Sequence, residues 1–228
     1  VLGAGISGHT AAAHLRRKLS KEHEVLVVSP NRNYQWVPSN IWVGIGRMKS
    51  KEVIFPLEPL YKRKGIGYKQ SKAVSFHPEG DSTETKPYIL VEGVYGDTLG
   101  KQEKVTYDYL INATGPKLAF DMTEGLVPGT NKAYSVCTYD HAEHASEALL
   151  KLIAEMKKSD KKVKILIGTG HAKSTCQGAA FEYILNVEKE LVNHGVRDKA
   201  EITWISNEYY LGDFGMDGML MEYNGFNM

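Results

Sequence analysis

Two features of this sequence could carry chemistry: a glycine-rich turn, Gly3-Ala4-Gly5-Ile6-Ser7-Gly8, and two cysteines, Cys137 and Cys176. Glycines with this spacing let a backbone turn approach a pyrophosphate, and a cysteine thiolate is a nucleophile and a redox group. The sequence therefore contains residues suited to dinucleotide binding and to thiol chemistry. The alternative for each cysteine is a small, buried, unreactive side chain.

The glycine turn is followed by the elements that a dinucleotide-binding unit needs. Residues 11–19 are rich in alanine and predict a helix, and residues 24–28 predict a second buried strand. In this arrangement Gly3 permits the tight bend, Gly5 admits a pyrophosphate and Gly8 allows the helix to pack closely on the strand. The alternative is a glycine turn that serves packing alone.

The second strand ends without the acidic residue that usually binds a ribose. Ser29-Pro30-Asn31 stands where Asp or Glu is expected, so Ser29 or Asn31 is a candidate neutral hydrogen-bonding partner. The stretch 34–46, which includes Pro38, is rich in aromatic residues and turn formers. We interpret it either as a packed surface loop or as a wall beside a planar cofactor.

The remainder of the first half predicts short elements that return to the nucleotide-binding pattern. Proline near the start, cations at the end and a terminal glycine predict a helix over 56–65. Short antiparallel strands are predicted at 66–70, 73–77, 88–92 and 104–107. The strand 109–114 then brings bare backbone to the ligand edge of the sheet. Further candidate cofactor-binding residues are Pro38, Ala73, Thr114, Gly115 and Pro116.

Each cysteine is predicted at the start of a helix. Thr138 or Asp140 can cap a helix that follows Cys137, and the partial positive charge of that terminus favours an anion there. His141, one turn further on, is a candidate proton partner for this thiol.

A strand predicted over 163–167 leads into a second glycine turn, in which Lys173 takes the place of the third glycine. Its bulk opposes the close packing that a pyridine-nucleotide site requires, and Cys176 follows at the start of another helix. Glu182 lies six residues beyond Cys176, which is a different face of a helix with 3.6 residues per turn. Glu182 is therefore either a carboxylate near the thiol or a surface group.

The composition excludes several classes of protein. The 228 residues are 42% apolar and 24% charged, which is typical of a globular domain, and 28 basic against 27 acidic residues do not favour nucleic acid as a partner. No apolar run approaches the length of about 20 residues that a membrane span needs. The two cysteines lie 39 residues apart and form neither a CxxC pair nor a zinc cluster, so no metal site is predicted.

Both ends of the sequence lack expected elements. The glycine motif begins at Gly3, which leaves two residues of the preceding strand, and residues 212–218 and 224–228 are predicted as loops without a closing strand. We therefore expect a fragment of a longer protein, with a nucleotide-binding domain over 1–118 and a second, incomplete domain over 119–228.

The glycine turn, together with the stretch from Tyr107 to Leu118, resembles the FAD half of flavoproteins with two dinucleotide-binding domains. Within that group, residues 34–44, 135–142 and 176–183 resemble sulfide:quinone oxidoreductases. The resemblance covers nearly the whole chain. Many reductases share the FAD motifs, whereas the two cysteine-containing stretches are more specific.

The resemblance implies a mechanism. In this family, cysteines near FAD take up sulfide as a persulfide or polysulfide, and electrons pass through FAD to a membrane quinone. It implies that Cys176 belongs to the redox pair, that Cys137 is the additional cysteine of sulfur handling, and that Glu182 matches an acidic position. The second redox cysteine, the quinone pocket and the membrane-binding helices would belong to a C-terminal region absent here. Asp213 stands where some members have a proton-transferring histidine.

We therefore predict an α/β flavoprotein with two Rossmann-like domains, three-layered with a mostly parallel sheet, an antiparallel β excursion in the first and a truncated second. The intact protein is expected to be a sulfide:quinone oxidoreductase, peripheral to a prokaryotic membrane, with the fragment alone inactive and a homo-oligomer left open. One alternative is an NAD(P)H-dependent flavin oxidoreductase, which Gly168 and Gly170 favour and Lys173 opposes. Another is a non-catalytic FAD-binding protein in which both cysteines are dispensable.

Overall fold

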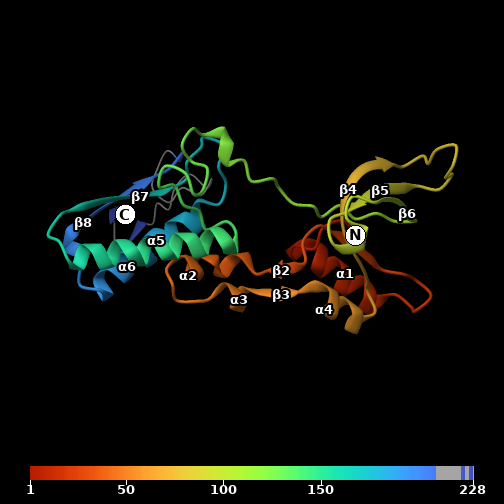
Figure 1. Cartoon of the computed structure of the whole chain (residues 1–228), viewed down its shortest axis with the longest axis horizontal. Coiled ribbons are helices and arrows are strands. Elements are labelled where there is room, and N and C mark those ends of the chain that lie inside the picture. Colours follow the sequence, from red (N-terminus) through yellow and green to blue (C-terminus); the bar gives the residue numbers. More distant parts are fainter. Residues whose placement is uncertain (209–221, 224–225, 228) are drawn as a thin grey trace. The chain divides into compact units, whose positions relative to one another are not determined.

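The computed structural model describes residues 1–208, 222–223 and 226–227. The chain divides into two compact units. Unit 1 contains Val1–Trp36 and Ile54–Lys117, and unit 2 contains Val37–Val53 and Leu118–Met228. The elements of each unit are labelled in Figure 1.

Unit 1 alternates helices and strands before it turns to an antiparallel hairpin. Its elements are α1 (Ile6–Lys18), β1 (Leu26–Ser29), β2 (Asn33–Gln35), β3 (Ile54–Pro56), α4 (Leu57–Lys64), β4 (Gly67–His77), β5 (Tyr88–Gly93), the 3-10 helix η2 (Gly96–Thr98) and β6 (Gln102–Thr106). The helix α4 ends at Gly65, which adopts the left-handed conformation with φ of 67°.

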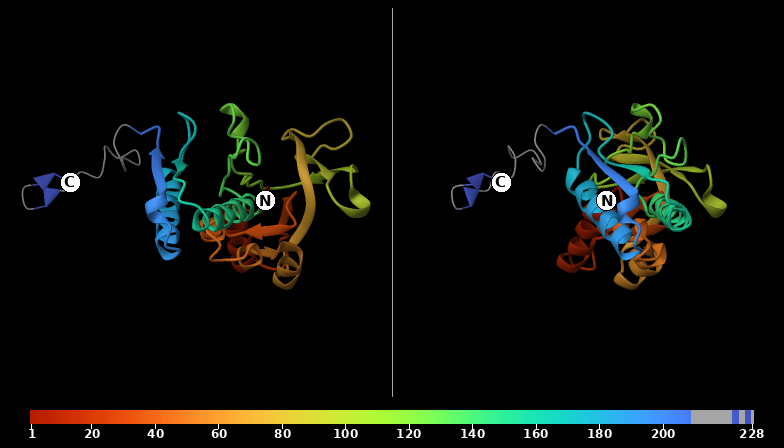
Figure 2. Two further views of the ribbon diagram at one scale, coloured as in Figure 1. Left: turned by 60° about the vertical axis from the view of Figure 1, so that its left-hand side comes forward. Right: turned by 90° about the vertical axis from the view of Figure 1, so that its left-hand side faces the viewer.

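The main sheet of unit 1 has the strand order β1-β4-β5-β6. The β1–β4 pair is parallel, and the β4–β5 and β5–β6 pairs are antiparallel. Leu2 forms parallel bridges to Val28 on one side and to Asn112 on the other, so the chain before the glycine turn lies between β1 and the returning segment. The first part of β4 pairs with β1 and the rest pairs with β5, so the sheet is mixed. Figure 2 shows β4 as one long strand.

Alternate residues of β1 face two different apolar clusters. Val27 packs with Ala12 of α1 and with Leu57 and Tyr61 of α4. Val28 packs with Leu2 and with the core residues of β5. Because side chains alternate along a strand, β1 joins a helical layer on one face to the hairpin side of the sheet on the other.

Unit 2 is a second βαβ arrangement joined by a short helical segment from earlier in the chain. Its elements are the 3-10 helix η1 (Val37–Ser39), α2 (Asn40–Gly44), α3 (Ser50–Val53), η3 (Phe120–Met122), α5 (Tyr139–Lys157), β7 (Val163–Gly168), α6 (Gln177–Asn193), η4 (Arg197–Lys199), β8 (Ala200–Ile205), β9 (Glu222–Tyr223) and β10 (Phe226–Asn227). The strands β7 and β8 pair in parallel, with α6 between them in the sequence.

Residues 37–53 pack with unit 2, whereas the predicted division at residue 118 assigned them to the first domain. Figure 1 shows α2 beside α5, and Ile45 belongs to the same buried cluster as apolar residues of α5 and α6. Arg47 forms two hydrogen bonds of 2.9 Å with the buried Glu190 of α6. These long-range contacts have no signature in the local sequence.

Most predicted elements are present, with several corrections. The two strands predicted at 66–70 and 73–77 are one strand, β4, with an irregularity between Ala73 and Ser75. The strand predicted over 109–114 is reduced to an isolated bridge at Asn112. Residues 226–227, predicted as loop, pair antiparallel with 222–223. The predicted loop 212–218 and Asp213 lie outside the described residues.

Candidate functional site

A cavity of about 370 Å³ lies in unit 1 around the glycine turn. Four stretches of chain meet there: the turn before α1, the end of β1, the middle of β4, and the segment that follows the bridge at Asn112. The residues that line it are Leu2, Gly3, Ala4, Gly5, Ile6, Ser7, Val28, Ser29, Pro30, Asn31, Ser71, Ala73, Ala113, Thr114, Gly115 and Pro116.

Close backbone packing explains two of the three motif glycines. Gly3 has φ of 92°, and a Cβ there would lie 2.2 Å from the carbonyl oxygen of Ala113. A Cβ on Gly8 would lie 2.1 Å from the carbonyl oxygen of Gly3. Both distances are well below van der Waals contact, so these glycines hold the turn between α1 and the returning segment.

Gly5 differs from the other two glycines. It has extended backbone with φ of −70° and ψ of −170°, which any residue can adopt, and a Cβ there would meet no protein atom within 4 Å. Gly5 also precedes α1 as its N-cap, and the first turn of this helix contains no acidic residue. The open space at Gly5 therefore lies at the start of α1, and the first backbone N–H groups of a helix have no intrahelical partner and suit an anionic group.

The polar residues at the cavity edge are held by local hydrogen bonds. Ser29 is buried, and its hydroxyl accepts a hydrogen bond of 3.3 Å from the backbone N–H of Asn31. At the opposite edge, the backbone N–H and the hydroxyl of Thr114 both donate to Oδ1 of Asn112, at 3.2 and 2.9 Å. The Asn112 side chain thus forms the turn that ends the returning segment.

The structure brings together most of the residues that the sequence nominated for cofactor binding. All of them line the cavity except Gly8, which packs beneath Gly3, and Pro38, which lies in η1 of unit 2. Sequence reasoning missed Leu2, Val28, Ser71 and Ala113. Ser71 belongs to no motif. It reaches the cavity because it lies on β4, which pairs with β1.

Both cysteines are exposed thiols in unit 2. Cys176 is the N-cap of α6 and has left-handed backbone with φ of 69°, a conformation that costs a non-glycine residue about 1 kcal/mol or more. Cys137 immediately precedes Thr138, the N-cap of α5, whose side chain does not cap the helix by a hydrogen bond. Cys176 therefore occupies the helix terminus itself, and Cys137 lies one residue outside it.

The other two predicted site residues of unit 2, Glu182 and His141, lie in different surroundings. Glu182 is exposed on α6. His141 lies in the first turn of α5, its ring contacts Phe120 edge-on, and its Nδ1 is buried without a hydrogen-bond partner among the described residues. Asn40, which the sequence did not single out, is buried with both side-chain polar atoms unpaired among those residues. Such groups are costly to leave unpaired.

At the second glycine turn, other residues of unit 2 occupy the space beside the backbone. A Cβ on Gly170 would lie 2.0 Å from a methyl carbon of Leu126, and the hydroxyl of Thr123 donates to the carbonyl oxygen of Gly170 at 2.9 Å. Gly170 corresponds to Gly5 in the first motif. The position that is open in unit 1 is therefore covered by a loop in unit 2.

No group of three or more His, Cys, Asp and Glu side chains among the described residues is arranged to hold a metal ion. None of the described helices combines the length and the apolar character that crossing a membrane requires.

The fold and the cavity define an α/β protein with a Rossmann-like dinucleotide-binding unit. Residues 1–180 match the family model of pyridine nucleotide-disulphide oxidoreductase, and the chain belongs to this family. The predicted α/β, Rossmann-like fold class is confirmed.

Two relatives show which kind of protein within this family the chain resembles. The chain is 31% identical over 219 residues to sulfide-quinone reductase of Aquifex aeolicus, covering 96% of this chain and 45% of the relative. The crystal structure of the sulfide:quinone oxidoreductase from that bacterium matches with a TM-score of 0.74 and 28% identity, covering 95% of this chain and 44% of the other. These comparisons confirm the resemblance seen in the sequence. The chain spans about half the length of these relatives.

A third comparison supports the fold alone. The structure of NDH2 from Plasmodium falciparum in complex with NADH matches with a TM-score of 0.59 and 19% identity, covering 89% of this chain and 40% of the other.

Proposed function

We propose that the intact protein is an FAD-dependent sulfide:quinone oxidoreductase, with unit 1 as its FAD-binding part and unit 2 as the part that carries the sulfur-handling cysteines. The observation that carries this proposal is the contrast between the two glycine turns. The first has open space at Gly5, whereas the second is filled by Leu126 at Gly170 and leads to a thiol. This contrast favours one dinucleotide site rather than two.

The residues of the cavity fit a dinucleotide. The backbone N–H groups at the start of α1 would hold the pyrophosphate near Gly5, and Ser29 or Asn31 would hydrogen-bond the ribose in place of a carboxylate. The backbone of Thr114 to Pro116 would form the opposite edge. When bound, FAD supplies a two-electron acceptor.

In this proposal Cys176 is the nucleophile and sulfur carrier. Joining the Cys176 thiolate and hydrosulfide by one S–S bond releases a proton and two electrons, and the flavin, when bound, would supply the two-electron oxidant that this bond requires. The exposure of Cys176 at the N-cap of α6 gives sulfide access, and the helix terminus favours the negative charge on the persulfide.

Cys137 has the supporting role, in sulfur transfer or release. It is exposed, so a second sulfur acceptor is accessible to solvent, and His141 in the first turn of α5 is the candidate proton partner. Glu182 is a weaker candidate, because it is exposed on α6 and six residues from Cys176. The quinone acceptor, the membrane surface and any homo-oligomer belong to this proposal for the intact protein.

Anaerobic stopped-flow reduction of the flavin tests the proposal in the full-length protein. We expect sulfide to bleach the flavin and NADH to leave it oxidised. Cys176→Ser should nearly abolish bleaching by sulfide, because a hydroxyl forms no comparable anion near neutral pH. Cys137→Ser, the matched change at the other thiol, should slow steady-state quinone reduction while it retains part of the first flavin reduction.

Two results would contradict the proposal. Fast bleaching by NADH with none by sulfide would favour the NAD(P)H-dependent alternative. Wild-type reduction kinetics in Cys176→Ser, with normal flavin content, would remove Cys176 from the reaction.

A further inference from the structure

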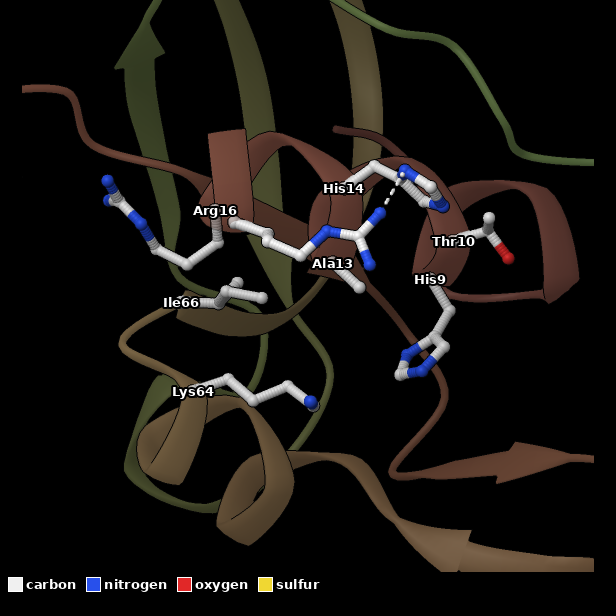
Figure 3. Close-up of a pocket in the computed structure, with 8 residues that line it drawn as sticks. His9, Thr10, Ala13, His14, Arg16, Lys64 and Ile66 are labelled. Carbon is white, nitrogen blue, oxygen red and sulfur yellow. Dashed lines mark hydrogen bonds between the residues drawn. The ribbon is translucent and has the colours of Figure 1, made fainter. Parts of the chain in front are cut away.

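Unit 1 contains a second cavity, of about 450 Å³, formed by α1 and the end of α4 (Figure 3). This cavity and the cavity at the glycine turn have no lining residue in common. The residues that line it are His9, Thr10, Ala13, His14, Arg16, Arg17, Lys64 and Ile66.

The lining is basic and, among the described residues that form it, contains no carboxylate. Both helices end in three consecutive cations, 16–18 in α1 and 62–64 in α4. Favourable interaction with the helix dipoles explains cations at each terminus. It does not explain why cations of both helices line one cavity, where they repel each other.

The cations of the cavity have different partners. The Arg16 guanidinium donates to the carbonyl oxygens of His23, at 2.6 Å, and of Leu19, at 3.1 Å, so it stabilises the turn after α1. None of the three cations of the lining forms an ion pair with a carboxylate in the described part of the chain. Arg16 is held by backbone carbonyl groups, so Arg17 and Lys64 are the cations that can turn to a ligand.

The two histidines of the lining add polar groups. Arg17 lies 3.0 Å from Nδ1 of His14, and because a guanidinium only donates, this nitrogen accepts and Nε2 keeps the proton (dashed line in Figure 3). The Lys64 side chain extends toward the His9 ring (Figure 3). Partial burial, and then the charge of Lys64, hold the pKa of His9 below its usual value.

We propose that this cavity binds a phosphate-bearing anion, with Arg17 and Lys64 supplying the positive charge. Phosphate oxygens accept charge-assisted hydrogen bonds from both kinds of cation, and a bound dianion would remove the repulsion between them. Ala13 and Ile66 provide an apolar surface for the carbon part of a phosphate ester. A soluble phosphate monoester and a phospholipid headgroup share this chemistry.

Calorimetric titration of the full-length, flavin-loaded protein tests the site, because bound flavin occupies the other cavity. The probes are inorganic phosphate and glycerol 3-phosphate, and, in a separate sedimentation assay, phosphatidylcholine vesicles with and without phosphatidic acid. The test variant is Arg17→Gln/Lys64→Gln. The matched control is Lys18→Gln/Lys62→Gln, which removes equal charge from the same helices outside the cavity.

We expect the dissociation constant of the bound probe to rise about tenfold or more in the test variant, because both charge-assisted bonds to the phosphate are lost. The control should change it about twofold or less, since exposed charges away from the ligand are screened. Binding of the soluble esters identifies a metabolite-type ligand, and binding only of phosphatidic acid vesicles identifies a lipid headgroup. No binding of any probe, or equal weakening in both variants, would overturn the proposal. Unchanged flavin content and melting temperature show that the variants are folded.

Discussion

We predict that a larger side chain at Gly5 impairs cofactor binding without lowering the stability of the fold. The backbone of Gly5 is extended, with φ of −70°, and a Cβ would meet no protein atom within 4 Å. Gly5→Ala should therefore leave the stability of the cofactor-free protein unchanged or raise it by about 0.4–1 kcal/mol, because alanine restricts the unfolded chain.

The matched change three residues later should do the opposite. In Gly8→Ala the new Cβ would lie 2.1 Å from the carbonyl oxygen of Gly3, so α1 or the turn must shift by about 1 Å to restore contact distance. Overpacking of this kind costs about 1–3 kcal/mol. For a protein of this size, that corresponds to a fall in melting temperature of roughly 2–12 °C.

Flavin binding should separate the two positions further. In Gly5→Val the branched side chain would fill the space where the pyrophosphate meets the backbone, and each hydrogen bond lost to this anion costs about 1.5–3 kcal/mol. The affinity for FAD should therefore fall about tenfold or more per bond. Flavin absorbance per protein and thermal unfolding of the cofactor-free form measure both effects. Normal flavin content in Gly5→Val, or unfolding of cofactor-free Gly5→Ala, would refute the assignment of this open space to the cofactor.

Three further predictions concern stability. Arg47→Met should lower the free energy of unfolding of unit 2 by about 2 kcal/mol or more, because the buried Glu190 loses both hydrogen bonds from Arg47. Denaturant unfolding measures this change. Hydrogen bonds from Lys104 and two other side chains lower the pKa of Asp81 from 3.8, so the stability they add is present above about pH 4 and is lost as the pH falls through the lowered pKa. Asp81→Asn should remove this acid dependence from hydrogen exchange in the β4–β5 hairpin. Gly65→Ala should cost about 1 kcal/mol, because Gly65 ends α4 in the left-handed conformation, whereas an alanine tolerated there would contradict that.

Local patterns in the sequence were sufficient to predict the elements around the glycine turn. The helix α1, the buried strand β1, and the α4 helix with its terminal Gly65 all follow from short-range preferences of the backbone and from apolar periodicity. The start of α6 at Cys176 was predictable for the same reason. The resemblance to flavoproteins also rests on short motifs, and the comparisons confirm it.

Other features depended on which surfaces meet in the folded chain. The motif assigns different tasks to Gly3, Gly5 and Gly8, but the residue that packs against Gly3 is Ala113, more than a hundred residues away, and the motif does not indicate that contact. Likewise, Leu126 covers Gly170 although nothing in either segment indicates the contact. Short-range preferences are encoded by neighbouring residues, whereas the empty space in which a ligand can bind is created only when distant segments pack together.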